Sequence, residues 1–168
     1  MDKRFPVFLA LGLVAVGALL FFILSATEGN HLRLEGKILK VRVMMQPGSS
    51  SALVFVDFRA SNPSDVRFVT GSAKMFLLPA RGEEQEGTTV SKPEVDTIFQ
   101  YQKLLGPKYN DVLSLQDRVA PHATLDRMMG ASFELGEDAI NQRKNLRVRL
   151  EDVDGAVADI RENPINAR

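Results

Sequence analysis

Residues 54–78, VFVDFRASNPSDVRFVTGSAKMFLL, consist of two strand-like runs joined by an Asn-Pro-Ser turn at residues 62–64, and this unit decides the fold class. In the first run, one face is entirely apolar and the other becomes polar at Asp57. In the second run, alternate residues over 69–77 share one mostly apolar side. A period of two is typical of β-strands, because successive side chains point to opposite faces. The unit therefore predicts two strands packed on a common core.

The chain after residue 31 repeats this pattern. Further strand-like runs, each bounded by turn residues, occupy residues 32–45, 112–119, 124–135, 146–150 and 156–160. A change of parity near residues 36–39 predicts a bulge or a change of sheet, and Asp154-Gly155 predicts a hairpin turn. About seven or eight short strands, with turns every 8–15 residues or so, are typical of an antiparallel sandwich. The sequence therefore predicts a mostly β fold, an immunoglobulin-like antiparallel β-sandwich.

One helix is inserted among the predicted strands, over residues 91–106. Ser91 and Glu94 form a Ser-x-x-Glu capping box, and Pro93 occupies the first turn. Apolar residues recur at helical spacing, and Gly106 followed by proline ends the helix. We expect this helix to lie against one end or edge of the sandwich, as a structural lid on the core.

The unit at residues 54–78 resembles the strand, Asn-Pro turn, strand unit of LEA14-type (water-stress and hypersensitive response) domains. Similar units occur in other immunoglobulin-like bacterial envelope domains. The sequence APHAT at residues 120–124 is similar to the proline-then-polar turn of these domains. The helix at 91–106 and the Glu-rich loop at 81–89 depart from the simplest version of the pattern. The resemblance implies an immunoglobulin-like sandwich and no particular activity, since sandwiches host many functions.

The N-terminal segment 5–26, FPVFLALGLVAVGALLFFILSA, contains no charged residue. As a helix rising about 1.5 Å per residue it would span about 33 Å, enough for a hydrocarbon core of about 30 Å. The segment thus predicts a single transmembrane helix that contacts the lipid bilayer. Lys3 and Arg4 precede it, which places the N-terminus in the cytoplasm. The alternative is a cleaved signal peptide, but cleavage after Ala26 would leave Leu24 where a small residue is needed.

The predicted organisation places the chain in the inner membrane as a single-pass protein. Its parts are a cytoplasmic N-terminus (1–4), a transmembrane anchor (5–26), a linker (27–31), an extracytoplasmic β-sandwich (32–162) and a tail (163–168).

Composition and motifs exclude several classes of chemistry. The chain has no cysteine and therefore neither disulfides nor thiolate sites. Its formal net charge of zero gives no electrostatic reason to expect a nucleic-acid partner. His31 and His122 lack a third ligand at metal spacing, and Asp152-x-Asp154 reads as a hairpin turn and not as a calcium loop. We expect no cofactor, no metal and no catalytic residue.

The predicted function is that of a non-enzymatic binding or scaffold module of the cell envelope, such as an accessory subunit of a membrane complex. The alternative is an extracytoplasmic enzyme or small-ligand-binding domain with a pocket under the inserted helix. The helix and the acidic loop before it, residues 79–109, are the expected contact region, because insertions on a rigid scaffold often carry function. Together with the basic cluster near the C-terminus, the candidate partner-contact residues are Glu83, Glu84, Glu86, Tyr101, Tyr109, Arg143, Lys144, Arg147 and Arg149.

Overall fold

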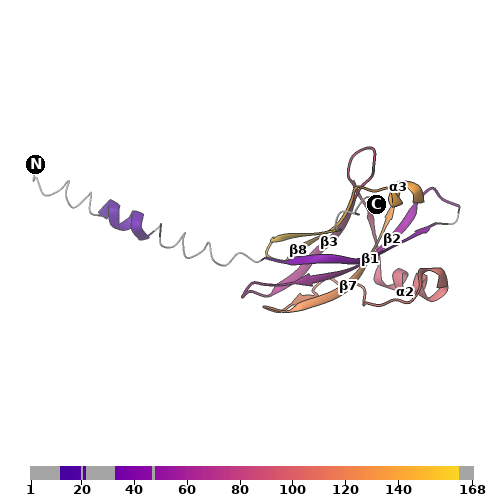
Figure 1. The fold of residues 1–168 in the computed structure, drawn as a ribbon. Coiled ribbons are helices and arrows are strands. Elements are labelled where there is room, and N and C mark those ends of the chain that lie inside the picture. The colour runs from indigo at the N-terminus through magenta and orange to yellow at the C-terminus, as the bar shows by residue number, and fades with distance from the viewer. Residues whose placement is uncertain (1–11, 20, 22–32, 47, 163–168) are drawn as a thin grey trace, which may run out of the picture. The chain divides into compact units, whose positions relative to one another are not determined.

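The computed structural model describes residues 12–19, 21, 33–46 and 48–162. The chain divides into two compact units, Met1–His31 and Leu32–Arg168. The second unit, drawn in Figure 1, contains all the strands of the described chain.

The transmembrane helix predicted at residues 5–26 is not borne out. In the described part of this segment the helical residues are 12–19 and 21, and no described helix is both long enough and apolar enough to cross a membrane. A membrane span needs about 20 consecutive apolar helical residues. The transmembrane part of the predicted fold class is therefore wrong. The other residues of 5–26, together with 1–4, 27–31 and 163–168, lie outside the described residues.

Residues 33–162 form a mostly β domain with two antiparallel sheets. The first sheet has the order β1-β2-β7-β5, made of β1 (Glu35–Met45), β2 (Ala52–Ser61), β7 (Thr124–Phe133) and β5 (Thr88–Val90). The second has the order β4-β3-β8-β9, made of β4 (Gln85–Glu86), β3 (Phe68–Leu78), β8 (Asn145–Asp152) and β9 (Val157–Arg161). A further short strand, β6 (Arg118–Val119), pairs with the start of β3.

The core lies between the two sheets and follows the predicted alternation. From the first sheet, Val54, Val56 and Phe58 point inward, and each is at most 1% exposed. From the second, alternate residues of β8 from Leu146 to Leu150 do the same. Burying these side chains stabilises the domain by about 1.5–3 kcal/mol each. The β-rich, two-sheet architecture is confirmed.

Two bulges change which side chains face the core. The register of β1 against β2 shifts between Ile38 and Lys40, as the parity change predicted. A second shift, in β3 at Gly71, was not predicted. Because of it, Phe68 and Thr70 are buried, and the regular alternation proposed for 69–77 is wrong for its first residues.

One strand segment links the two sheets. Residues of β4 pair with β3, and those of β5 pair with β7, so the chain crosses from one sheet to the other at Gly87. The Gly87 N–H donates to the Met75 carbonyl at 2.9 Å. A Cβ at Gly87 would lie 2.6 Å from the Phe133 ring, so any larger residue at this crossing would have to displace that ring.

The inserted helix begins as predicted and ends earlier. It is α2 (Lys92–Tyr101), followed by the 3₁₀ turn η2 (Lys103–Leu105). The Ser91 N–H and hydroxyl both donate to Glu94 Oε2, at 2.9 and 2.6 Å. A second short helix, α3 (Glu137–Asn141), precedes β8.

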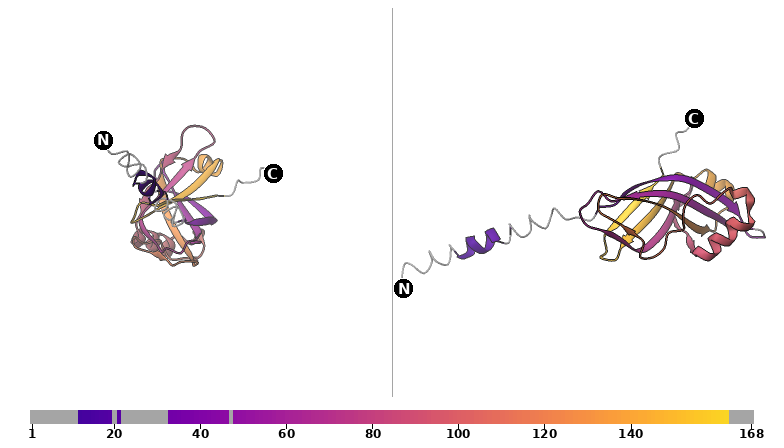
Figure 2. Two further views of the ribbon diagram at one scale, coloured as in Figure 1. Left: turned by 90° about the vertical axis from the view of Figure 1, so that its left-hand side faces the viewer. Right: turned by 90° about the horizontal axis from the view of Figure 1, so that it is seen from below.

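The position of α2 differs from the prediction. It packs on the outer face of the first sheet, where Val95 is fully buried against Phe55 and Met128, and not against an end or edge of the sandwich. Both views of Figure 2 show α2 outside the strands. The helix packs there because Leu53 and Phe55 make the outer face of β2 apolar for half its length. The apolar side of α2 shields this half of the strand from water. The strand predicted at 112–119 is reduced to β6 and a parallel bridge between Val112 and Met128.

Candidate functional site

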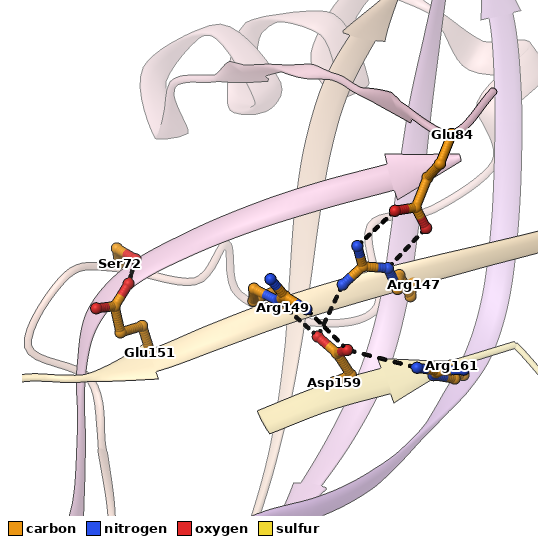
Figure 3. Close-up of polar contacts among 7 residues, drawn as sticks. All are labelled: Ser72, Glu84, Arg147, Arg149, Glu151, Asp159 and Arg161. Carbon is orange, nitrogen blue, oxygen red and sulfur yellow. Dashed lines mark hydrogen bonds and ion pairs between the residues drawn. The ribbon is translucent and has the colours of Figure 1, made fainter. Parts of the chain in front are cut away.

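A cluster of charged side chains occupies the outer face of the second sheet (Figure 3). Arg147 on β8 donates to both carboxylate oxygens of Glu84, with distances of 2.7 and 2.6 Å. Its remaining terminal nitrogen donates to Asp159 on β9 at 3.0 Å. Arg149 also donates to Asp159, at 2.8 and 3.1 Å, and Arg161 lies 3.6 Å from the same carboxylate. The acidic loop and the basic strand, predicted as two separate contact regions, therefore bind each other.

The guanidinium groups of Arg147 and Arg149 lie over the ring of Phe76. The guanidinium carbon of Arg147 lies 4.0 Å from the ring centroid, and that of Arg149 lies 5.5 Å away. Such cation–π contacts stabilise partly buried cations by about 1–2 kcal/mol. Arg147 is only 11% exposed at its side chain, so its donors are directed at this protein and not at solvent.

The ion pairs change the acidity of the groups that they join. Hydrogen bonds from Arg147 hold the pKa of Glu84 below its ordinary value. Hydrogen bonds from Arg149, with help from the charge of Arg147, lower the pKa of Asp159 in the same way. The pKa of Arg147 is raised, chiefly by Glu84. Glu84 and Asp159 are thus both held in the ionised form near neutral pH, where the three arginines share these two carboxylates.

The other predicted contact residues of the loop and the basic cluster are mostly paired as well. Glu86 lies 3.0 Å from Lys74. Arg143 donates to Glu162 at 2.8 and 2.5 Å and to the Ile140 carbonyl. Two residues, Glu83 and Lys144, are exposed and form no ion pair within the described residues.

The two predicted tyrosines lie elsewhere, near the end of α2. Tyr101 is 72% exposed and Tyr109 is 63% exposed. Between them, Leu104 on η2 is 102% exposed, which means that its side chain projects fully into solvent. Tyr101, Leu104 and Tyr109, together with Lys40 and Lys103, are called the tyrosine–leucine patch below.

A buried ion pair, which was not predicted from the sequence, lies beneath Tyr109. Arg42 on β1 donates to Asp57 on β2 at 2.8 Å, and the side chains are only 5% and 3% exposed. The Asn110 amide donates to the other Asp57 oxygen at 2.9 Å. The rings of Phe99 and Tyr109 cover the Arg42 guanidinium, with centroids 5.1 and 5.2 Å away. Nε and Nη1 of Arg42 have no hydrogen-bond partner.

A signal for this pair exists in the sequence. Asp57 follows Leu53 and Phe55 on the otherwise apolar second face of β2, and Arg42 stands with Lys40 on the polar parity of β1. In the register of the two strands Lys40 stands opposite Asp57, so Arg42 is its diagonal neighbour on the same face.

A pocket of about 460 Å³ lies beside the first half of α2, where the alternative function requires one. Leu53, Val90 and Ile98 form its apolar wall. Its polar side chains include Thr88, Thr89, Thr97 and Glu94, and all four are exposed. Ligand sites use a few convergent polar groups in a concave apolar setting. Here these four polar groups are exposed, and one of them, Glu94, is engaged in capping α2.

The remaining candidate groups have structural partners. Asp152 accepts from the Val69 and Asp154 amides, at 2.5 and 2.9 Å, in the confirmed β8–β9 hairpin. His122 lies 2.8 Å from Asp65, while His31 lies outside the described residues. Within the described residues, no three His, Asp or Glu side chains are grouped so that they could hold a metal ion.

Comparisons with known proteins give weak similarities only. No family model and no curated protein matches the chain. Northeast Structural Genomics Consortium target SoR45 is 12% identical with a TM-score of 0.40, covering 82% of this chain and 86% of that one. The putative ApaA protein from Bordetella pertussis is 13% identical with a TM-score of 0.38, covering 77% and 88%. The archaellum periplasmic stator protein FlaG from Sulfolobus acidocaldarius is 10% identical with a TM-score of 0.37, covering 77% and 98%. Similarity at this level supports no functional conclusion.

Proposed function

We propose that the domain is a non-enzymatic binding or scaffold module of the cell envelope, and that the tyrosine–leucine patch is its contact surface. The observation that carries the proposal is the exposure of three large side chains within residues 101–109, on a segment that is itself firmly held. An envelope location is supported by the apolar, uncharged residues 5–26. The relation to LEA14-type domains stays a prediction.

Four contacts hold this segment in place. Leu105 is buried under α2 at 8% exposure, and Lys108 Nζ lies 2.5 Å from Asp96 on the helix. Tyr109 covers the Arg42 guanidinium, and Asn110 donates to Asp57. A segment fixed in this way presents Tyr101 and Leu104 outward in one arrangement, and a preordered surface loses less entropy on binding.

The patch fits binding better than the charged face of the second sheet does. On that face, ion pairs within the domain already satisfy Arg147, Arg149 and Glu84. Breaking them to bind a partner would cost the hydrogen bonds that they form. At the patch, contact with a partner removes apolar surface from water without breaking any bond, which is favourable.

Site-specific photocrosslinking in cells tests the proposal. A photoreactive residue replaces Leu104 in the full chain, and the matched control replaces Leu115, which is 68% exposed on a different loop. We expect adducts, with either protein or lipid, at position 104 and far fewer at position 115. Equal yields at the two positions would show that the patch has no specific partner.

A further inference from the structure

From the composition and shape of the tyrosine–leucine patch we infer that its partner is an anionic lipid surface. This inference rests on the proposed function and specifies its partner. Residues 101–109, YQKLLGPKY, contain two tyrosines, two lysines and no acidic residue. Side chains of this kind are typical of the membrane–water interface: aromatic rings lie among headgroups, leucine enters the acyl boundary, and lysine contacts phosphate.

The charges around the patch favour an anionic partner. Lys108 is neutralised by Asp96, but within the described residues Lys103 and Lys40 pair with no carboxylate. Lys40 lies over the Tyr109 ring, 5.0 Å from its centroid, so its charge is held at the patch. Asp57, a nearby acidic group, is buried and compensated by Arg42. Each lysine near an anionic bilayer contributes about 1 kcal/mol, or about fivefold in affinity.

The small size of the patch and its projecting leucine favour a bilayer over a folded protein as the partner. A stable protein interface uses about 20–30 residues on each side, whereas this patch offers three apolar side chains. Leu104 projects completely, so a protein partner would need a matching pocket. A fluid headgroup layer accepts a projecting leucine without such a pocket, and a few inserted apolar groups with nearby cations suffice for reversible binding.

Vesicle binding by residues 32–168 tests the inference. This unit has its own hydrophobic core and contains all the described strands, so it is able to fold alone. The apolar residues 5–26 are left out so that lipid binding reports on the patch. Flotation is measured with vesicles of phosphatidylcholine alone and of phosphatidylcholine mixed with phosphatidylglycerol. We expect binding to the mixed vesicles only, and weaker binding at high salt.

Matched variants identify the residues responsible. Lys103→Glu should weaken binding by at least about fivefold, and Leu104→Ser by about tenfold. The controls Lys92→Glu and Leu115→Ser change an exposed lysine at the start of α2 and an exposed leucine on a different loop, and should bind as the parent does. Circular dichroism melting checks that all four variants are folded.

Three outcomes would overturn the lipid inference: equal binding to both kinds of vesicle, equal losses in the controls, or no loss in Leu104→Ser. If vesicles fail to bind while the photoreactive residue at position 104 gives protein adducts, the binding module stands and its partner is a protein. If position 104 gives no specific adduct at all, the proposed function itself fails.

Discussion

Removing the carboxylate of Asp57 should destabilise the domain strongly, because it would leave Arg42 buried without compensation. In the folded domain Arg42 has a single side-chain hydrogen bond, to Asp57, while its Nε and Nη1 have none. The Asp57→Ala variant would therefore keep a guanidinium that is 5% exposed with no hydrogen-bond acceptor. Breaking a buried pair in this way costs about 3–5 kcal/mol. The Phe99 and Tyr109 rings contribute about 1–2 kcal/mol and cannot offset the loss.

Urea unfolding of residues 32–168, followed by circular dichroism, measures this cost. The control is Asp126→Ala, which breaks a pair with Arg59 that has two hydrogen bonds of 2.7 Å but side chains 32% and 44% exposed. That exposed pair should be worth less than about 1 kcal/mol. The double variant Arg42→Met, Asp57→Leu removes both charges and should recover most of the stability. A cost for Asp57→Ala no larger than that of the control, or a double variant as unstable as the single one, would refute the reasoning.

Two further predictions concern the second sheet and the crossing strand. The lowered pKa values of Glu84 and Asp159 stabilise the folded state above the ordinary carboxyl pKa of about 4, and this stability is lost as the pH falls through the lowered values. The urea midpoint of unfolding should therefore fall between about pH 5 and pH 3, and it should fall less steeply in Arg147→Met. Parallel curves of urea midpoint against pH for the parent and the variant would contradict this. Gly87→Ala should lower the free energy of unfolding by about 1–3 kcal/mol, because the added Cβ meets the Phe133 ring; Gly136→Ala, where a Cβ meets no atom within 4 Å, should cost clearly less in the same urea assay.

Features that depend on local pattern could be predicted from the sequence. The alternation of β8, the Asp154-Gly155 hairpin and the capping of α2 each involve neighbouring residues, and all are present in the structure. The bulge of β1 was also visible as a change of parity. The bulge at Gly71 was not visible, because a valine next to a buried phenylalanine reads equally well in either parity.

Features that depend on long-range pairing could not be predicted. Glu84 and Arg147 are 63 residues apart, and nothing in either local sequence shows that they meet. Both residues were therefore predicted to contact another molecule, whereas in the structure they form an ion pair with each other. The membrane span was inferred from apolar composition and length alone, and these two properties do not show where a helix begins and ends.

The short strands have a consequence for how the protein behaves at high concentration. Long strands with a free edge tend to pair with other chains and aggregate. Here β4 and β6 cover parts of one edge of β3, and β5 with Val112 covers one edge of β7. Each covering piece is only two or three residues long, too short to template a neighbouring chain. Deleting residues 85–90 would uncover part of the edge of both β3 and β7, and should make the domain form β-rich aggregates.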